Sequence, residues 1–499
     1  MNIGNRYIDN VSDHCRSLGQ RRKGGGEMDL LEKLGAYARS GACSMHMPGH
    51  KGAGPGTELP WALDITEIDG FDNLHDAHGV LREAMDRAAG LWGSDRAFFL
   101  VGGSTCGILA GIAAAVSPGS TVLLPRGCHK SVYNALELLD LVPVYLPVPA
   151  DEAAGAAGSL PPETVAAALA DHPEARLVIV TSPTYEGVVS DVAAIVDLAH
   201  AAGVPVLVDE AHGAHLGFSP AFPTGAVAAG ADVVIQSLHK TLPSLTQTAL
   251  AHWRRGLVEG EALARYLTVF QTSSPSYLLM GSMDRCVGLL AARGREIFAA
   301  YEKNLAVFDR AILPLRKLRV LCHGGDALAD HPAFYAFDPG KLVISTRGTS
   351  MTGPALMDTL RRDYGIELEM ALGGYALAMT SICDTPETLG RPSAALLEID
   401  RGLEAAPWPD SPAACPIPPR RMGPRKARAL PGGPAPLGDA VGRVAGEMVW
   451  AYPPGVPLLV PGEEVTEALA RSLEEMSRRG VALHGERGRP PETVWVLEP

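Results

Sequence analysis

The sequence predicts an α/β fold in which a parallel sheet is covered by helices on both faces. Short apolar runs alternate with Ala-rich segments of helical spacing along much of the chain. The runs cover residues 96–103, 121–127, 175–183, 204–212 and 231–240. Because they are apolar throughout, both faces of each strand are expected to be buried, which is typical of parallel sheets. This order of elements predicts a doubly wound layer.

Composition limits the class of protein. The chain has 499 residues, of which 46% are hydrophobic and 20% are charged. It can therefore bury a large core and form about two to four domains. The formal net charge of −13 argues against general nucleic-acid binding through electrostatics. Because the sequence contains neither a membrane-length apolar stretch nor the apolar segment of a secretory signal, we expect a cytoplasmic protein that binds no membrane.

The pattern of elements divides the chain into five parts. Residues 1–60 are interpreted as an N-terminal arm, and the strongly alternating runs place a large domain over 61–300. A long helical stretch then leads to weaker strands, which indicates a smaller α/β domain over 301–405. Residues 406–428 are rich in Pro and Arg and are interpreted as a linker, and residues 429–499 as a C-terminal domain.

Polar clusters follow the ends of the five predicted strands. They read GGST, RGCHKS, SPTYEG, DEAHGAH and SLHK along the chain. In open α/β sheets, ligands bind outside the carboxyl ends of the strands. Because the carboxyl ends of parallel strands meet at one edge of the sheet, we expect the five clusters to form one site.

The first cluster is suited to bind an anion. Residues 102–107, GGSTCG, follow a strand and open a helix, where free backbone N–H groups and the helix dipole attract negative charge. Ser104 and Thr105 add hydroxyl donors. A tight strand–helix turn with a helix cap is the alternative interpretation. The motif is neither a dinucleotide fingerprint nor a Walker loop.

Three more side chains suggest a flat ligand with a carbonyl group. Asp209 ends a buried strand, where a carboxylate needs a cationic or protonated partner. Lys240 ends the next strand, and a desolvated lysine becomes an amine nucleophile that can form a Schiff base. An imidazole at His129 could stack on a flat ring. The alternatives are a capping aspartate, an exposed turn lysine and a hydrogen-bonded loop histidine.

No metal is expected in this site. The eight cysteines are scattered and contain no CxxC pair, so we expect reduced thiols rather than a thiolate zinc site. A metal bound by Asp209, Glu210, His212 and His215 is a rival interpretation. It would leave Lys240 and the GGST turn unused. Pyridoxal 5′-phosphate (PLP) has a phosphate, a ring nitrogen, a carbonyl and a flat ring, so we expect this cofactor.

Eight stretches of the sequence form a recognisable set: MHMPGHKGAG, GGSTCG, RGCHKS, SPTYEG, DEAHGAHLGF, SLHKTLPSLTQ, QTSSPSYLLMGSMD and AYPPGVPLLVPGE. The set resembles the bacterial Orn/Lys/Arg decarboxylase family, and the resemblance extends from about residue 28 to the end. It implies the aspartate-aminotransferase-like fold (PLP fold type I), in which the large domain binds the cofactor and a smaller α/β domain and a C-terminal domain follow.

The resemblance implies roles for individual residues. Lys240 is expected to form the Schiff base, Asp209 to bind the pyridine nitrogen and His129 to stack on the ring. With His212, which is expected near the ring and the substrate, these are the expected catalytic residues. The other expected cofactor contacts are the phosphate ligands Ser104, Thr105, Ser237 and His239, and Thr184 near the phenolic oxygen.

The resemblance also implies a homodimer with shared active sites, to which Thr272 and Ser273 of the partner subunit contribute. The large N-terminal wing domain of the inducible acid-stress enzymes is lacking, so a short form without a decameric assembly is expected. His46 and His50 are candidates for the entrance of the site. The glycine-rich stretch 367–381 departs from relatives that often carry an acidic residue there, which affects the choice of substrate.

The expected reaction is PLP-dependent decarboxylation of a basic L-amino acid to its amine, in polyamine metabolism. We expect arginine first, then lysine, then ornithine. Glu186, Glu463 and Glu464 are candidates for binding the distal cation of the substrate, or are surface carboxylates. One alternative is an aldolase-type lyase or an aminotransferase, in which Arg347 would grip the substrate carboxylate. A regulatory protein without activity and a metal hydrolase are further alternatives.

Overall fold

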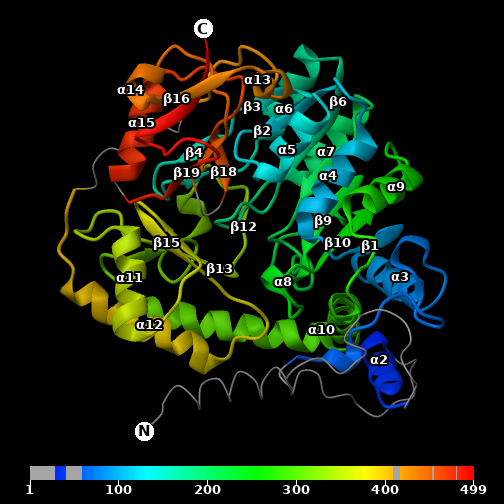
Figure 1. The fold of residues 1–499 in the computed structure, drawn as a ribbon. Coiled ribbons are helices and arrows are strands. Elements are labelled where there is room, and N and C mark those ends of the chain that lie inside the picture. Colours follow the sequence, from blue (N-terminus) through cyan, green and yellow to red (C-terminus); the bar gives the residue numbers. More distant parts are fainter. Residues whose placement is uncertain (1–28, 41–58, 408–415, 452–454, 479, 499) are drawn as a thin grey trace. The chain divides into compact units, whose positions relative to one another are not determined.

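The computed structural model describes residues 29–40, 59–407, 416–451, 455–478 and 480–498 (Figure 1). The chain divides into two compact units. The first unit consists of Met1–Ala115, Pro205–Lys303 and Ser381–Thr385, and the second of Val116–Val204, Asn304–Thr380 and Pro386–Pro499. The domain boundaries predicted from the sequence remain predictions. His46 and His50 lie outside the described residues.

Four strands lie side by side in the first unit. Their order is β1 (Arg96–Leu100), β10 (Ala249–Trp253), β9 (Val233–Ser237) and β8 (Val206–Asp209). β8 and β9 are parallel, as the sequence predicts. β10 is an antiparallel strand that the sequence analysis does not predict, and it pairs with both β1 and β9. Since β1 and β9 both oppose β10, they run in the same direction and end at the same edge.

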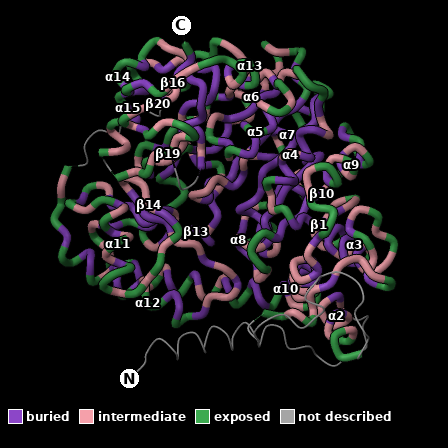
Figure 2. The backbone as a smooth tube through the Cα atoms, viewed as in Figure 1, coloured by how far each residue is buried: buried purple, intermediate pink, exposed green. Residues whose placement is uncertain are grey.

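Helix α4 (Gly103–Ala115) packs closely on these strands. A Cβ atom on Gly107 would lie 2.6 Å from Leu100 Cδ1, and one on Gly111 would lie 2.6 Å from Leu207 Cδ1. Only glycine permits this approach of the helix to the sheet. Figure 2 shows that α4 and β10 are largely buried. The other helices of this region are α2 (Leu30–Ala38), α3 (Val80–Trp92), α8 (Leu238–Thr241), α9 (Gly260–Phe270) and α10 (Tyr277–Ile312), of which the part up to Lys303 belongs to the first unit.

Three parallel strands lie in the second unit, in the order β6 (Ala175–Thr181), β2 (Thr121–Pro125) and β3 (Val142–Leu146). A helix follows each of these strands along the chain: α5 (Lys130–Leu138) follows β2, α6 (Pro162–Asp171) follows β3 and α7 (Val192–Ala201) follows β6. The alternation of strand and helix is therefore the one that the sequence predicts. Short strands pair as β4 (Ala150–Asp151) with β5 (Ala156–Ala157) and β7 (Val188–Val189) with β12 (Ala336–Phe337).

A separate antiparallel sheet of the second unit has the order β11 (Arg319–Val320), β13 (Lys341–Ser345), β15 (Tyr375–Met379) and β14 (Met370–Leu372). The helices of this region are α11 (Gly353–Tyr364) and α12 (Pro386–Gly402). Val343 and Leu377, each fully buried, lie in the core on this sheet. These weaker apolar runs of the sequence therefore form their own small sheet.

The C-terminal part of the second unit has its own core. β16 (Gly432–Pro436) pairs with β20 (Thr493–Leu497), and β18 (Val456–Leu459), β17 (Val449–Ala451) and β19 (Leu483–Gly485) form a second sheet. Helices α13 (Pro424–Arg428), α14 (Leu437–Ala440) and α15 (Glu467–Arg478) accompany them, and α13 falls within the predicted linker. No helix of the described ranges is long and apolar enough to cross a membrane.

Candidate active site

The register of the first unit brings two of the predicted clusters to one edge. Leu100 at the end of β1 is opposite Ala249, and Ala249 is opposite Ser237 at the end of β9. The GGST turn after β1 and the SLHK stretch after β9 therefore begin at the same level of the sheet. In the parallel neighbour β8, Asp209 is opposite Ile235 of β9, so the DEAH turn begins beside them.

Lys240 and His212 are in direct contact. Lys240 lies in the single turn of α8, directly after β9, and its Nζ is 3.0 Å from Nε2 of His212 in the turn after β8. Both side chains are largely withdrawn from solvent, with His212 only 7% exposed. An imidazole nitrogen that accepts a hydrogen bond from a lysine can also accept its proton. The pair thus has the geometry of an amine with an adjacent proton acceptor.

Asp209 ends β8 as a buried carboxylate, with 5% of its surface exposed. Its Oδ1 accepts a hydrogen bond from the backbone N–H of Ala211 at 3.1 Å. A carboxylate at such a position favours a cationic or protonated partner, because burial of a charge without one is costly. The geometry therefore agrees with a carboxylate that binds a protonated ring nitrogen.

The first unit also offers groups that fit a phosphate. Ser104 and Thr105 lie in the first turn of α4, where backbone N–H groups have no partner within the helix. The Oγ atom of Ser237 is fully buried and has no hydrogen-bond partner among the described residues. A buried hydroxyl without a partner is costly, and a phosphate oxygen would satisfy it. The chemistry of these donors fits the phosphate of PLP.

His239 is constrained by its backbone contact. Its Nδ1 is 2.9 Å from the carbonyl oxygen of Thr248, so Nδ1 carries a proton and donates it. Burial lowers the pKa of His239, and the Thr248 carbonyl only partly opposes this effect. His239 can donate from Nε2 to a phosphate only in its doubly protonated form, which an adjacent anion would favour.

The second unit brings two other clusters together. His129 and Thr184 follow the parallel neighbours β2 and β6. His129 caps α5, and its Nδ1 accepts a hydrogen bond from the backbone N–H of Ser131 at 3.3 Å and lies 2.9 Å from the Ser131 hydroxyl. Thr184 Oγ1 accepts one from the N–H of Val188 at 3.2 Å. The turns are thus fixed by local hydrogen bonds.

The three candidate carboxylates for a substrate cation differ in their partners. Glu186 accepts a hydrogen bond from the hydroxyl of Tyr375 at 2.6 Å. Burial, followed by the Glu186 charge, raises the pKa of Tyr375 well above its usual value, so this donor stays neutral. Glu463 and Glu464 instead form ion pairs with Arg126 at 2.7 Å and Arg421 at 2.6 Å. The charges of both C-terminal carboxylates are therefore already compensated.

Arg126 is the partner of the candidate carboxylate Glu463, and it was not identified from the sequence. Its guanidinium binds both oxygens of Glu463, at 2.7 and 2.8 Å, and lies 4.9 Å from the ring centre of Tyr145. Arg126 belongs to the segment between β2 and His129, so the ion pair ties that segment to the C-terminal part of the unit. The RG of the RGCHKS cluster was the only sequence signal for it.

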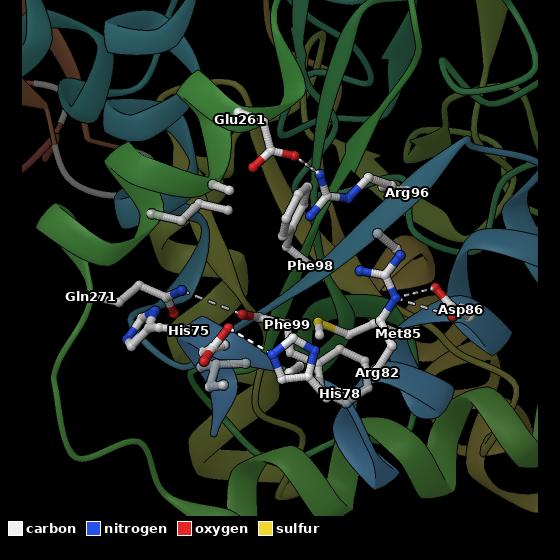
Figure 3. Close-up of a pocket in the computed structure, with 16 residues that line it drawn as sticks. His75, His78, Arg82, Met85, Asp86, Arg96, Phe98, Phe99, Glu261 and Gln271 are labelled. Atoms are coloured by element: carbon white, nitrogen blue, oxygen red, sulfur yellow. Dashed lines mark hydrogen bonds and ion pairs between the residues drawn. The ribbon is translucent and has the colours of Figure 1, made fainter. Parts of the chain in front are cut away.

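A pocket of about 360 Å³ lies in the first unit (Figure 3). Residues of α3, β1 and α9 line it, and an ion pair of 2.7 Å between Arg96 and Glu261 closes one side. None of the residues predicted from the sequence to be catalytic lines this pocket. It adjoins the predicted dimer segment, because His75 Nε2 lies 2.9 Å from the carbonyl oxygen of Thr272. Thr272 and Ser273 are both exposed.

The fold defines the class of protein, an α/β protein with the aspartate-aminotransferase-like fold. The crystal structure of Francisella novicida lysine decarboxylase LdcF has this architecture, with a TM-score of 0.78 at 18% identity over 94% of this chain and 81% of that one. The structure of Escherichia coli constitutive lysine decarboxylase has a TM-score of 0.76 at 21% identity, over 99% and 83% of the two chains.

The chain belongs to the Orn/Lys/Arg decarboxylase family. Residues 29–357 match the family's major domain and residues 433–479 match its C-terminal domain. Arginine decarboxylase of Halalkalibacterium halodurans is 34% identical over 94% of this chain and 97% of that protein. Arginine decarboxylase of Bacillus subtilis is 34% identical over 95% and 98%. The resemblance found in the sequence is confirmed, and the protein is a decarboxylase.

The Arg126–Glu463 ion pair predicts a large loss of stability on substitution. In Glu463→Gln, the guanidinium of Arg126, which is only 14% exposed, loses its fully buried countercharge. The free energy of unfolding should therefore fall by about 3–5 kcal/mol. Glu464→Gln is the matched control, because its arginine partner is 55% exposed and the change should cost less than about 1 kcal/mol. Urea unfolding measures both; equal stability of the two variants would contradict the structural role of the pair.

Glu210 predicts a specific dependence of stability on pH. Burial raises the pKa of this carboxyl to about 8, and hydrogen bonds from Gln236 and the Ala226 N–H offset only part of the effect. The unfolded chain therefore releases this proton near its ordinary pKa of 4.5, whereas the folded chain keeps it until about pH 8. Stability due to this group is complete at low pH and is lost as pH rises through that window.

Glu210→Gln removes this titration. In the variant, the side-chain amide of Gln236 can rotate by a half turn, so that its oxygen accepts a hydrogen bond from the new amide at position 210. His252 contacts Gln236 and is a neutral ring, because burial lowers its pKa to about 3, so it can change which ring nitrogen carries the proton. Melting temperatures measured between pH 5 and 9 should therefore fall less steeply for the variant than for the wild type. Parallel curves for the two proteins would show that Glu210 is ionised in the folded state.

Proposed function

We propose that the protein is a PLP-dependent decarboxylase of a basic L-amino acid, with arginine preferred over lysine and ornithine, and that it supplies amines to polyamine metabolism. The observation that carries the proposal is the 3.0 Å contact of Lys240 and His212 at the ends of two buried parallel strands. The relatives named arginine decarboxylase, similar over nearly their whole length, support the order of substrates.

Residues of the first unit would hold the cofactor through each of its functional groups. Lys240 would bind the aldehyde, Asp209 the ring nitrogen, and Ser104, Thr105, Ser237 and His239 the phosphate. When bound, PLP supplies a protonated ring that takes up the electron pair of the bond between Cα and the carboxylate. The family resemblance adds His129 and Thr184 as further contacts, with His129 against the face of the ring.

Lys240, His212 and Asp209 would divide the handling of protons between them. His212 Nε2 accepts a proton from the Lys240 ammonium across 3.0 Å, which leaves the lysine as a nucleophilic amine. The same imidazole, once protonated, would be an acid 3.0 Å from the amine of Lys240. Asp209 would accept a hydrogen bond from the ring nitrogen at the strand end and thereby favour a proton on that nitrogen.

Among the three candidate carboxylates, Glu186 is best suited to bind the distal cation of the substrate. The hydrogen bond that Glu186 accepts comes from the neutral hydroxyl of Tyr375, so this bond does not compensate the negative charge of the carboxylate. Glu463 and Glu464 each already bind an arginine. A guanidinium or ammonium group needs an acceptor whose charge is still available, because a charge-assisted hydrogen bond is roughly twice as strong as a neutral one.

We further propose a cytoplasmic homodimer with shared active sites. Thr272 and Ser273 are exposed on the first unit, which leaves them accessible to a second copy of the chain. The segment is ordered by a hydrogen bond from the backbone N–H of Ser274 to Thr272 Oγ1 at 3.1 Å.

Lys240→Ala tests the proposal. The variant should lose the visible absorbance of the bound cofactor and decrease amine production by more than about 1,000-fold, since the nucleophile is removed. Lys303→Ala, at an exposed position of α10, is the control and should behave as the wild type. Agmatine, cadaverine and putrescine are measured after incubation with arginine, lysine and ornithine. A variant that keeps both absorbance and amine production would refute the assignment, and keto-acid formation by the wild type would indicate an aminotransferase.

Glu186→Gln tests the substrate-binding part. Losing one charged contact to the distal cation should raise KM for the preferred amino acid by about 10- to 100-fold, while cofactor absorbance is retained. Glu464→Gln is the control, and its KM should change by less than about threefold because Arg421 already holds that carboxylate. If Glu464→Gln has the larger effect, the C-terminal carboxylate binds the substrate instead.

A further inference from the structure

The loop between β11 and β12 in the second unit gathers side chains that ligate metals. Cys322, Asp326 and His331 each point one ligand atom toward the others, and these three atoms lie within 4.8 Å of one another. We propose that Cys322, Asp326 and His331 bind a divalent transition-metal cation such as zinc. Thiolate, imidazole and carboxylate are a common donor set for zinc, and three protein ligands leave a fourth position for water.

The distances suit a metal ion with small adjustments. His331 Nε2 and Asp326 Oδ2 are 2.7 Å apart and share a proton. Tetrahedral zinc places such a nitrogen and oxygen about 3.3 Å apart, since each metal bond is about 2.0–2.2 Å long. The cation would replace this proton, and the two ligand atoms would separate by about 0.6 Å. Cys322 also donates its backbone N–H to Asp326 Oδ2 at 2.8 Å, which holds the loop around the carboxylate.

Asp151 orients the imidazole from the other side. Its Oδ1 lies 3.1 Å from His331 Nδ1, and both side chains are only 1% exposed. Histidine ligands of metals usually donate their second ring N–H to a carboxylate, which fixes the ring and raises its basicity. Asp151 also accepts the backbone N–H of Ala154 at 2.7 Å, so the acceptor is itself held in place in the β4–β5 hairpin.

Carboxylates outnumber cations beside the cluster, because Asp151 and Asp326 both contact His331 and one guanidinium, that of Arg319, lies 3.9 Å from Asp326 Oδ1. Burial, and then the carboxylates of Asp326, Asp151 and Asp330, raise the pKa of the Cys322 thiol to about 12. Burial opposes the protonation of His331, but its hydrogen bonds to Asp326 and Asp151 prevail and raise its pKa. Cys322 is partly exposed, whereas the side chains of Asp326 and His331 are only 5% and 1% exposed, so an ion would enter past Cys322.

A bound cation would have a structural effect. It would join the loop after β11 to the β4–β5 hairpin through the chain of contacts from the metal to His331 and Asp151. These elements lie in the second unit, and none of the residues proposed to hold PLP belongs to the cluster. The inference is therefore independent of the proposed function.

Cobalt titration of the chelator-treated, full-length protein tests the site. Cobalt should bind once per chain at this site and produce a near-ultraviolet band from the thiolate–cobalt bond. Cys322→Ser should abolish the band, and Asp326→Asn and Asp151→Asn should weaken binding by about 10- to 100-fold. Cys383→Ser, at another partly exposed cysteine, is the control and should titrate as the wild type.

The thiolate–cobalt band and the melting temperature with added zinc together decide whether the site exists. Zinc should raise the melting temperature of the wild type and of Cys383→Ser but not that of Cys322→Ser, with circular dichroism as the check of folding. If Cys322→Ser does not fold, Asp326→Asn retains the thiol and still tests a ligand. The absence of a thiolate–cobalt band in the wild type, or its persistence in Cys322→Ser, would overturn the inference and leave a hydrogen-bonded cluster only.

Discussion

The candidate active site depends on a lysine that is held at the end of a buried sheet by an imidazole. Lys240 Nζ and His212 Nε2 are 3.0 Å apart, and a lysine placed there without an acceptor would be costly. The parallel pairing of β8 with β9 provides the acceptor, because it sets the turns after both strands side by side. Close packing of α4, which Gly107 and Gly111 permit, covers the same strands. The site is thus a consequence of how the sheet is packed.

Three buried carboxylates, those of Glu463, Glu447 and Glu210, have different kinds of partner. Glu463 has an arginine partner, Arg126. Glu447 accepts three backbone N–H groups, those of Arg487, Gly488 and Trp495, at 2.6–2.9 Å. Among the residues that the structure describes, Glu210 contacts neither a cation nor a third donor, and burial raises its pKa. A carboxylate is therefore available for a substrate cation only where its partners are neutral, as at Glu186.

The fold was largely predictable because its strands are apolar throughout and alternate with helices. The antiparallel strand β10 was not, since direction depends on pairing rather than on composition. Lys240, Asp209 and the GGST turn were recognisable from their places at strand ends. The contact of Lys240 with His212 needed the register of two strands. The partner of Glu463 could not be predicted, because Arg126 is 337 positions away and only the folded chain brings them together.

Reduction with borohydride followed by peptide mass spectrometry tests the central claim most directly, because it fixes a lysine-bound aldehyde covalently. The protein loaded with PLP is reduced, digested and mapped. The mass of the cofactor is expected on the peptide that contains Lys240 and on no other lysine. Label on a different lysine, or no label in a protein that still decarboxylates a basic amino acid, would contradict it.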